Sequence, residues 1–253
     1  MMIWSYSRVK TFEDCPYKWY LKYILYPEET GKKLFFANYG KLMHDILAQY
    51  YTKALSGEEA QDEYLRLFKS HVLCGRPPNA KVLENYFISG LNYLQNIQPI
   101  GSGNILCVEK KIEFDIGEID AVGIVDLCVE GEDGVYVVDH KSKALTPRSH
   151  NRTTRKSDIE LNEYFKQLYL YSKAIYSSFG KLPDKLVFNC FRTGQIISES
   201  FDNSTYQNTL EWFEVIVNTI KRTTEFRPKI DVFKCEYICE MQDFCEYYKV
   251  FRG

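Results

Sequence analysis

Apolar residues recur every three to four positions through the first hundred residues, which is the spacing of amphipathic helices. Ser7 can cap a first helix that runs to about Asp14 and continues through the aromatic segment CPYKWYLKYILY. Further helices are expected over residues 40–55, 58–70 and 79–97. Four helices should therefore precede the first strand.

The hydrophobic pattern changes to a period of two from Asn104 onward, which is typical of β-strands. Three such segments follow one another: ILCVEKKIEFDI, EIDAVGIVDLCVE and GVYVVDHKS. After them we expect a polar loop over residues 144–157, a helix over 158–179, two strands within 184–200 and a helix over 203–222. This order predicts an α/β fold in which helices flank a mixed sheet, with an N-terminal helical lobe and a cysteine-rich C-terminal tail.

The composition is that of a folded protein, because 45% of the 253 residues are hydrophobic and 26% are charged. This length is close to the upper size of a single core, so we expect one domain over residues 1–253. Within it we expect an N-terminal helical region (residues 1–100), a core (residues 101–222) and a tail (residues 223–253). Lysine and arginine number 32 against 34 acidic residues, so a polyanionic partner must meet a local basic patch.

Membrane insertion and export are not expected from this sequence. No stretch approaches the roughly 18 apolar residues that span a bilayer, and Arg8 and Lys10 interrupt the N-terminal segment. We therefore expect a soluble, cytoplasmic protein whose eight cysteines are thiols or metal ligands rather than disulfides.

Two aspartates and a lysine at the ends of apolar strands form the most informative pattern. Asp139 and Lys141 share a strand face, and a hairpin can place Asp126 of the preceding strand beside them. Charged strand residues are mostly solvated on an exposed face. Here both carboxylates emerge from strongly apolar runs, where adjacent carboxylates repel unless they are protonated or bridged by a cation, for which Mg²⁺ or Mn²⁺ is suited. Glu109 and Glu113 on the preceding strand are further acidic candidates, which we assign to the strand face.

Asp126 and the Asp139-His140-Lys141 triplet resemble the signature of the PD-(D/E)XK nuclease superfamily. The resemblance implies a restriction-endonuclease-like mixed sheet and a divalent metal that activates water against a phosphodiester. It also implies that Asp126, Asp139 and the backbone carbonyl of His140 hold the metal, and that Lys141 is catalytic.

Two further segments resemble motifs of RecB-like nucleases. YGKLMHDIL carries Gly40 and His44 in the spacing of their Gly-x-x-x-His helix, and QLYLY carries Gln167 and Tyr171 in that of their Gln-x-x-x-Tyr motif. Without this resemblance His44 is an ordinary helix histidine, and Gln167 and Tyr171 are a half-buried stripe. With it, His44 joins the metal ligands, while Gln167 and Tyr171 hold the catalytic lysine or the DNA backbone.

Cys235, Cys239 and Cys245 form a C-x3-C-x5-C pattern near the C-terminus, and Cys15 is the best candidate for a fourth ligand. This distribution resembles iron–sulfur members of the RecB-like and CRISPR adaptation nucleases, although the first two cysteines of the trio are one residue further apart here. Four thiolates also bind zinc, but we favour a structural 4Fe-4S cluster that joins the tail to Cys15. The remaining cysteines are expected to be free buried thiols: Cys74, Cys107, Cys128 and Cys190.

The segment 141–156 has six basic residues and no acidic one, and it begins at the proposed metal site. A solvated loop is the plain alternative, but this position favours contact with DNA phosphates. The residues expected to make these contacts are Lys143, Arg148, Arg152, Arg155 and Lys156. N-terminal aromatic residues such as Trp4 and Trp19 are better explained as core than as surfaces that stack on bases.

Together these features predict a metal-dependent DNA exonuclease that acts on single-stranded DNA or DNA ends, uses Mn²⁺ or Mg²⁺ and carries a 4Fe-4S cluster. The resemblance also implies protein partners in recombination, repair or CRISPR adaptation. Two alternatives stay open: a non-catalytic DNA-binding module of the same fold, and a restriction-type endonuclease.

Overall fold

The structure is a computed structural model that describes residues 2–26, 34–101, 103–149 and 154–252. Its N-terminal elements are α1 (Tyr6–Asp14), α2 (Pro16–Tyr20), a π-helical turn (Leu21–Leu25), α3 (Phe35–Tyr51), α4 (Gly57–Val72) and α5 (Ala80–Gln95). The central elements are β1 (Gly103–Ile116), β2 (Ile119–Gly131), β3 (Gly134–His140), α6 (Lys156–Phe179), β4 (Lys185–Cys190), β5 (Gln195–Ser200) and α7 (Asn203–Arg222). The tail contains α8 (Val232–Tyr237), a 3-10 turn (Gln242–Phe244) and α9 (Glu246–Arg252). The predicted succession of helices, sheet, helix, strands and helix is confirmed.

The first helix begins before the predicted cap. Ser5, not Ser7, caps α1, because the Ser5 hydroxyl oxygen accepts a hydrogen bond from the Arg8 N–H at 3.2 Å. The helix stops at Cys15, whose backbone is extended, and α2 starts at Pro16, whose ring suits a first helical turn. Cys15 therefore lies at the joint between two helices.

The third helix spans Phe35–Tyr51 rather than the predicted 40–55. Phe35 and Tyr39 are buried, so the apolar face of the helix continues upstream of Gly40. α4 and α5 lie within two residues of their predicted bounds. Because of the shift, His44 lies in the middle of α3.

A five-stranded mixed sheet with the order β1-β2-β3-β4-β5 forms the centre of the fold. β1, β2 and β3 form the predicted antiparallel meander, β3 and β4 are parallel, and β4 and β5 are antiparallel. Ile116 pairs with Ile119 across a two-residue turn, in which Gly117 adopts a positive φ of 57°. α6 supplies the long crossover that the parallel pair β3–β4 requires.

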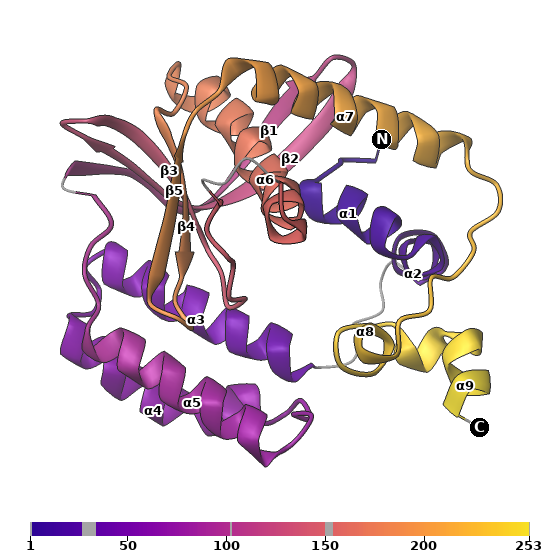
Figure 1. Cartoon of the computed structure of the whole chain (residues 1–253), viewed down its shortest axis with the longest axis horizontal. Coiled ribbons are helices and arrows are strands. Elements are labelled where there is room, and N and C mark those ends of the chain that lie inside the picture. The colour runs from indigo at the N-terminus through magenta and orange to yellow at the C-terminus, as the bar shows by residue number, and fades with distance from the viewer. Residues whose placement is uncertain (1, 27–33, 102, 150–153, 253) are drawn as a thin grey trace.

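Helices cover both faces of this sheet (Figure 1). α3, α4 and α5 lie on one side, and α6, α7 and α1 lie on the other. Each side has its own buried cluster, with Leu127 and Val138 in the first and Val125 in the second. The second cluster also contains Trp4 and Trp19, as expected for core residues. None of the helices in the described part of the chain is both long and apolar enough to cross a membrane.

The C-terminal tail packs against the first two helices, at the right of Figure 1. The two carboxylate oxygens of Glu240 lie 2.6 Å from Lys18 Nζ and 2.7 Å from Lys22 Nζ. The Tyr17 hydroxyl donates a hydrogen bond to Glu246 Oε1 at 2.9 Å. These contacts join residues that are more than two hundred positions apart in the sequence.

Candidate metal and nuclease site

The β2–β3 hairpin brings the two predicted aspartates together. Its last pair is Leu127 with Val138, so Asp126 and Asp139 lie opposite one another where the strands begin to separate. Asp126 Oδ2 accepts a hydrogen bond of 2.7 Å from the backbone N–H of His140. Both carboxyl groups are buried, with 6% and 2% of the residue exposed. Two acids therefore meet in a region of low dielectric constant, where the charge of both is costly.

Lys141 is held by residues from two elements. Its Nζ lies 2.7 Å from Asp139 Oδ2 and donates a hydrogen bond to Gln167 Oε1 at 2.8 Å. The Gln167 amide in turn donates to the Tyr171 hydroxyl at 2.9 Å. The four predicted residues Asp139, Lys141, Gln167 and Tyr171 thus form one chain of contacts from β3 to α6. This chain fixes where the ammonium group points.

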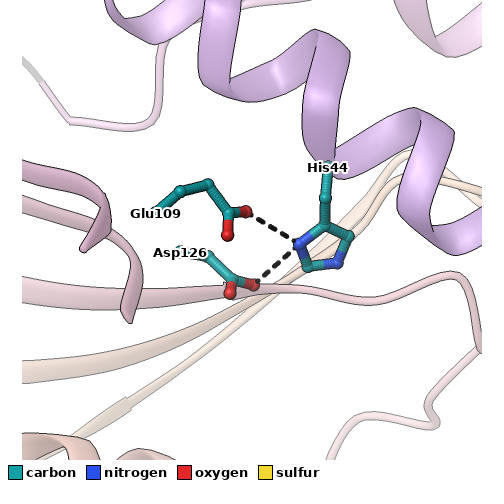
Figure 2. A group of neighbouring side chains, drawn as sticks. All are labelled: His44, Glu109 and Asp126. Carbon is teal, nitrogen blue, oxygen red and sulfur yellow. Dashed lines mark hydrogen bonds and ion pairs between the residues drawn. The ribbon is translucent and has the colours of Figure 1, made fainter. Parts of the chain in front are cut away.

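His44 reaches the same region from α3 (Figure 2). Its Nδ1 lies 3.0 Å from Glu109 Oε1 and 3.5 Å from Asp126 Oδ2. Its Nε2 lies 2.8 Å from the backbone carbonyl oxygen of His140. Because both ring nitrogens face acceptors, the imidazole is a double donor and carries a positive charge.

Glu109, which we expected to be an ordinary strand-face residue, lies beside this group, with its carboxylate against His44 Nδ1. The residue lies on β1 across from Asp126, and its φ of 42° is in the left-handed region that residues other than glycine rarely adopt. The two-residue turn at Gly117 fixes the β1–β2 register, so counting back from this turn would have placed Glu109 opposite Asp126. Glu113 does lie on an exposed strand face, where it pairs with Lys111.

The carboxylates around His44 change its acidity and that of Asp126. Burial alone would lower the pKa of His44, but Glu109, Asp126 and Asp139 outweigh it and raise that pKa to about 9. Burial and the neighbouring Asp139 raise the pKa of Asp126 to about 7. The raised pKa of His44 reflects the negative charge of the acids around it, whereas the raised pKa of Asp126 reflects burial first and the charge of Asp139 second.

This donor set fits a hard divalent cation. Ligand atoms of His44, Glu109 and Asp126 all lie within 4.8 Å of one another. The buried Asp139 Oδ2 atom contacts the Lys141 ammonium group at 2.7 Å but accepts no well-aligned hydrogen bond from a described group. Carboxylate oxygens and an imidazole suit Mg²⁺ or Mn²⁺. A dication here would take over the charge that the protons on His44 and Asp126 carry in its absence.

His140 faces the site only through its backbone. Its ring is buried and stacks on Tyr51 at a centroid distance of 5.8 Å. Its Nδ1 lies 2.9 Å from the Asn189 amide nitrogen, and burial keeps the pKa of the ring well below its usual range. The carbonyl that the resemblance assigns to the metal is the group that contacts His44 Nε2. A metal ion bound to this carbonyl oxygen would replace its contact with His44 Nε2.

The family model of the PD-(D/E)XK nuclease superfamily matches residues 3–246. The chain belongs to this superfamily. No curated protein matches the chain at a significant level. Nucleases of this superfamily use divalent metals, and the group of His44, Glu109 and Asp126 lies where such an ion would bind.

Similar solved structures agree with the fold. The crystal structure of a presumed exonuclease from Eubacterium rectale has a TM-score of 0.53 and 12% sequence identity, covering 99% of this chain and 88% of that one. At this identity the likeness shows the fold alone. A second structure, of a protein named SSO0001, has a TM-score of 0.30 and 16% identity, covering 76% and 81% of the two chains. That likeness is too weak to carry an argument.

The basic loop of this PD-(D/E)XK protein is largely paired with acids. Lys143 contacts Glu160, and Arg148 makes a two-point contact with Glu199 at 2.8 and 2.9 Å. Arg155 lies 3.8 Å from Asp158, and Lys156 is exposed at the start of α6. Arg152 lies outside the described residues. The expected phosphate contacts of these residues stay a prediction.

The four predicted cluster cysteines line one cavity. Cys15 at the α1–α2 joint faces Cys235, Cys239 and Cys245 of the tail across it. The backbone N–H groups of Lys18 and Lys229 each approach Cys15 Sγ at 3.4 Å. Further backbone N–H groups, from Met241, Tyr247 and Tyr248, donate to the sulfurs of Cys239 and Cys245. Such donors stabilise sulfur atoms that carry negative charge.

The other cysteines are unpaired thiols, as expected, with one difference in burial. Cys107, Cys128 and Cys190 are buried. Cys74 is exposed, because it follows the end of α4 in a loop at the surface. The prediction of a buried thiol was wrong for Cys74.

Proposed function

We propose that this chain is a metal-dependent deoxyribonuclease that removes nucleotides from single-stranded DNA or from DNA ends. The observation that carries the proposal is the position of Lys141, between Asp139 and Gln167 and beside the acids of the candidate metal group. A scaffold that only bound DNA would have no need for buried, mutually repelling carboxylates next to a fixed ammonium group.

The residues of the candidate site have different chemical roles in the proposed reaction. The bound dication supplies Lewis acidity and lowers the pKa of water. Asp126, Asp139, Glu109 and His44 are the groups that would hold it. Lys141 positions the attacking water and neutralises charge that develops on the phosphate, because its Nζ is fixed by two contacts. Gln167 and Tyr171 are positioning residues that act through Lys141.

End-labelled oligonucleotides with Mn²⁺ or Mg²⁺ test this function. We expect Asp139→Ala and Lys141→Ala to abolish cleavage while DNA binding is largely kept. Lys111→Ala is the matched control, because Lys111 is exposed on β1 and pairs only with Glu113 among the described residues. Full cleavage by both site variants would overturn the proposal. Linear and circular single-stranded DNA separate an exonuclease, which leaves the circle intact, from an endonuclease.

We also propose that the cavity of four cysteines holds a 4Fe-4S cluster rather than zinc. One tetrahedral zinc brings its sulfur ligands to about 3.8 Å from one another. Among the described cysteines no three sulfur atoms lie within 4.8 Å of one another, which suits a larger centre. Burial raises the pKa of Cys239 to about 11 and also raises that of Cys245, so a cationic centre is needed to keep them as thiolates.

Anaerobic purification followed by absorption spectroscopy and iron analysis tests the cluster. We expect four irons per chain and a brown protein, and Cys239→Ser should lose both. Cys74→Ser is the matched control, because Cys74 is exposed and lies outside the cavity. A colourless protein that binds one zinc would overturn the cluster and leave the nuclease proposal intact.

The proposed setting is the cytoplasm, where thiolate-bound iron is not exposed to an oxidising compartment. Protein partners in recombination, repair or CRISPR adaptation stay a prediction.

A further inference from the structure

A cleft of about 830 Å³ opens beside Lys141 and extends to the tail. Seventeen residues line it, of which five are aromatic. Basic and acidic side chains are nearly balanced, five against four. Several lysines are already paired with acids, as Lys143 is with Glu160 and Lys234 with Asp14. The cleft is therefore better suited to the flat faces of bases than to the phosphates of a duplex.

A continuous series of contacts leads from the catalytic strand to this tail. The backbone carbonyl of Ser142, the residue after Lys141, accepts a hydrogen bond of 2.9 Å from Arg192 Nε. The Arg192 guanidinium lies over the Tyr86 ring, with Cζ 5.0 Å from its centroid. Among the described residues no carboxylate forms an ion pair with Arg192. This arginine is thus a cation beside the active site that is free to meet a phosphate.

Aromatic rings continue the path beyond Arg192. Tyr86 and Phe36 have centroids 5.3 Å apart, and Phe36 and Phe233 have centroids 6.0 Å apart. Phe233 is 49% exposed and lines the cleft, so part of its ring is accessible there. It lies on α8, two residues before Cys235. The packing of the fold does not use the exposed side of the Phe233 ring.

We propose that a single DNA strand enters the active site through this cleft, with a base stacked on the exposed ring of Phe233, which Phe36 supports, and a phosphate held by Arg192. The inference rests on the proposed nuclease function and names its substrate as unpaired DNA. A duplex hides the faces of its bases, so it cannot use these rings. Stacking of this kind is tolerant of sequence, because every base has an aromatic face.

Anisotropy of fluorescent oligothymidine, measured with Ca²⁺ in place of Mn²⁺ so that the strand is not cut, tests the cleft directly. We expect Phe233→Ala to weaken binding about tenfold, because one base loses its stacking partner. Phe233→Trp should keep the affinity of the wild type. Val232→Ala is the matched control, because Val232 is 59% exposed on the same helix but does not line the cleft.

An oligonucleotide of the same length that lacks bases separates stacking from charge. The wild type should bind it more weakly than oligothymidine, and Phe233→Ala should have no further effect on it. Equal oligothymidine affinities of the wild type and Phe233→Ala would overturn the cleft proposal even if DNA is cut. A wild type that cuts no DNA but shows the Phe233 effect on binding would refute the nuclease and leave the cleft.

Discussion

The Lys141 ammonium group depends on two side chains of α6 that do not contact the candidate metal group in the described structure. Gln167 Oε1 accepts from Lys141 Nζ at 2.8 Å, and the Gln167 amide is itself oriented by the Tyr171 hydroxyl. Tyr171 is buried, and a side chain added at Gly123 would stand 3.0 Å from its ring. The Tyr171 ring therefore packs against β2, which fixes the direction of its hydroxyl group.

We expect Gln167→Leu to lower the rate of cleavage at saturating DNA by about 10- to 100-fold, because Lys141 loses one of the two groups that orient it. Tyr171→Phe should lower the rate less, since it removes only the group that orients Gln167. The two effects should not add: in the Gln167→Leu background, Tyr171→Phe should cost nothing more. Single-turnover rates of the two variants and the double variant measure this coupling, and simple additivity would refute the chain of contacts.

Glu109 offers a test of the metal group that does not depend on DNA cleavage. We expect Glu109→Gln to weaken Mn²⁺ binding about tenfold or more, because a charged oxygen ligand becomes a neutral amide. The matched control is Glu113→Gln on the same strand, where Glu113 faces solvent and pairs with Lys111. Calorimetric titration with Mn²⁺ measures both. Equal affinities in the two variants would remove Glu109 from the site.

At the residue scale, the sequence predicted which residues would come together at the candidate site, with the exception of Glu109 on β1. Asp126, Asp139 and Lys141 could be found because they follow apolar strand runs, where a charge needs a partner. Glu109 could not be found by the same rule, since it is surrounded by the polar sequence EKKIE. Only the hairpin register and the unusual backbone at Glu109 mark it.

At the scale of elements, period-two alternation was enough to predict β1, β2 and β3, whereas the helix bounds near Ser5 and Phe35 were missed. Those bounds depend on contacts rather than on pattern: a hydroxyl capping an N–H in one case, and burial of an additional helical turn in the other. The docking of the tail on α2 was foreseen only through its cysteines. Its ion pairs between Glu240 and two lysines have no local sequence signal.

The Glu240 ion pairs give a stability effect with a defined pH range. Burial opposes the charge of Glu240, but Lys18 and Lys22 outweigh it and lower its pKa from 4.5 to about 2. Because the folded-state pKa is depressed, the pairs stabilise the fold above the ordinary 4.5, and this stability is lost as the pH falls toward 2. We expect Glu240→Gln to lower the free energy of unfolding by about 1 kcal/mol near neutral pH.

Urea unfolding of the wild type and Glu240→Gln at a series of pH values measures this effect. The difference between their free energies of unfolding should shrink as the pH falls below 4.5. Glu84→Gln, an exposed position on α5, is the control and should match the wild type throughout. A Glu240→Gln difference that stays constant with pH would show that the loss comes from packing rather than from charge.

At the scale of the whole molecule, the first helices and the C-terminal tail pack together around the cavity of four cysteines. Cys15 and the tail cysteines line one cavity, and α8 carries Phe233 from that cavity into the cleft wall. We propose that residues 1–253 fold as one unit, in which these contacts hold together the helical region (residues 1–100), the core (residues 101–222) and the tail (residues 223–253). On this proposal, the proposed substrate path depends on the proposed cluster, whereas the candidate metal group on α3, β1 and β2 does not.

Because of this dependence, we expect one variant to lose DNA binding and to keep Mn²⁺ binding. Cys239→Ser should release α8 and weaken oligothymidine binding at least as much as Phe233→Ala does, because the whole wall that carries Phe233 loses its anchor. Mn²⁺ binding should stay near that of the wild type, since His44, Glu109 and Asp126 lie on α3, β1 and β2. Retained Mn²⁺ binding also reports that the core is folded.

The Cys74→Ser control should change neither quantity. If Cys239→Ser loses its iron and still binds oligothymidine like the wild type, α8 docks without the cluster, and the role of the cluster in forming the cleft is refuted.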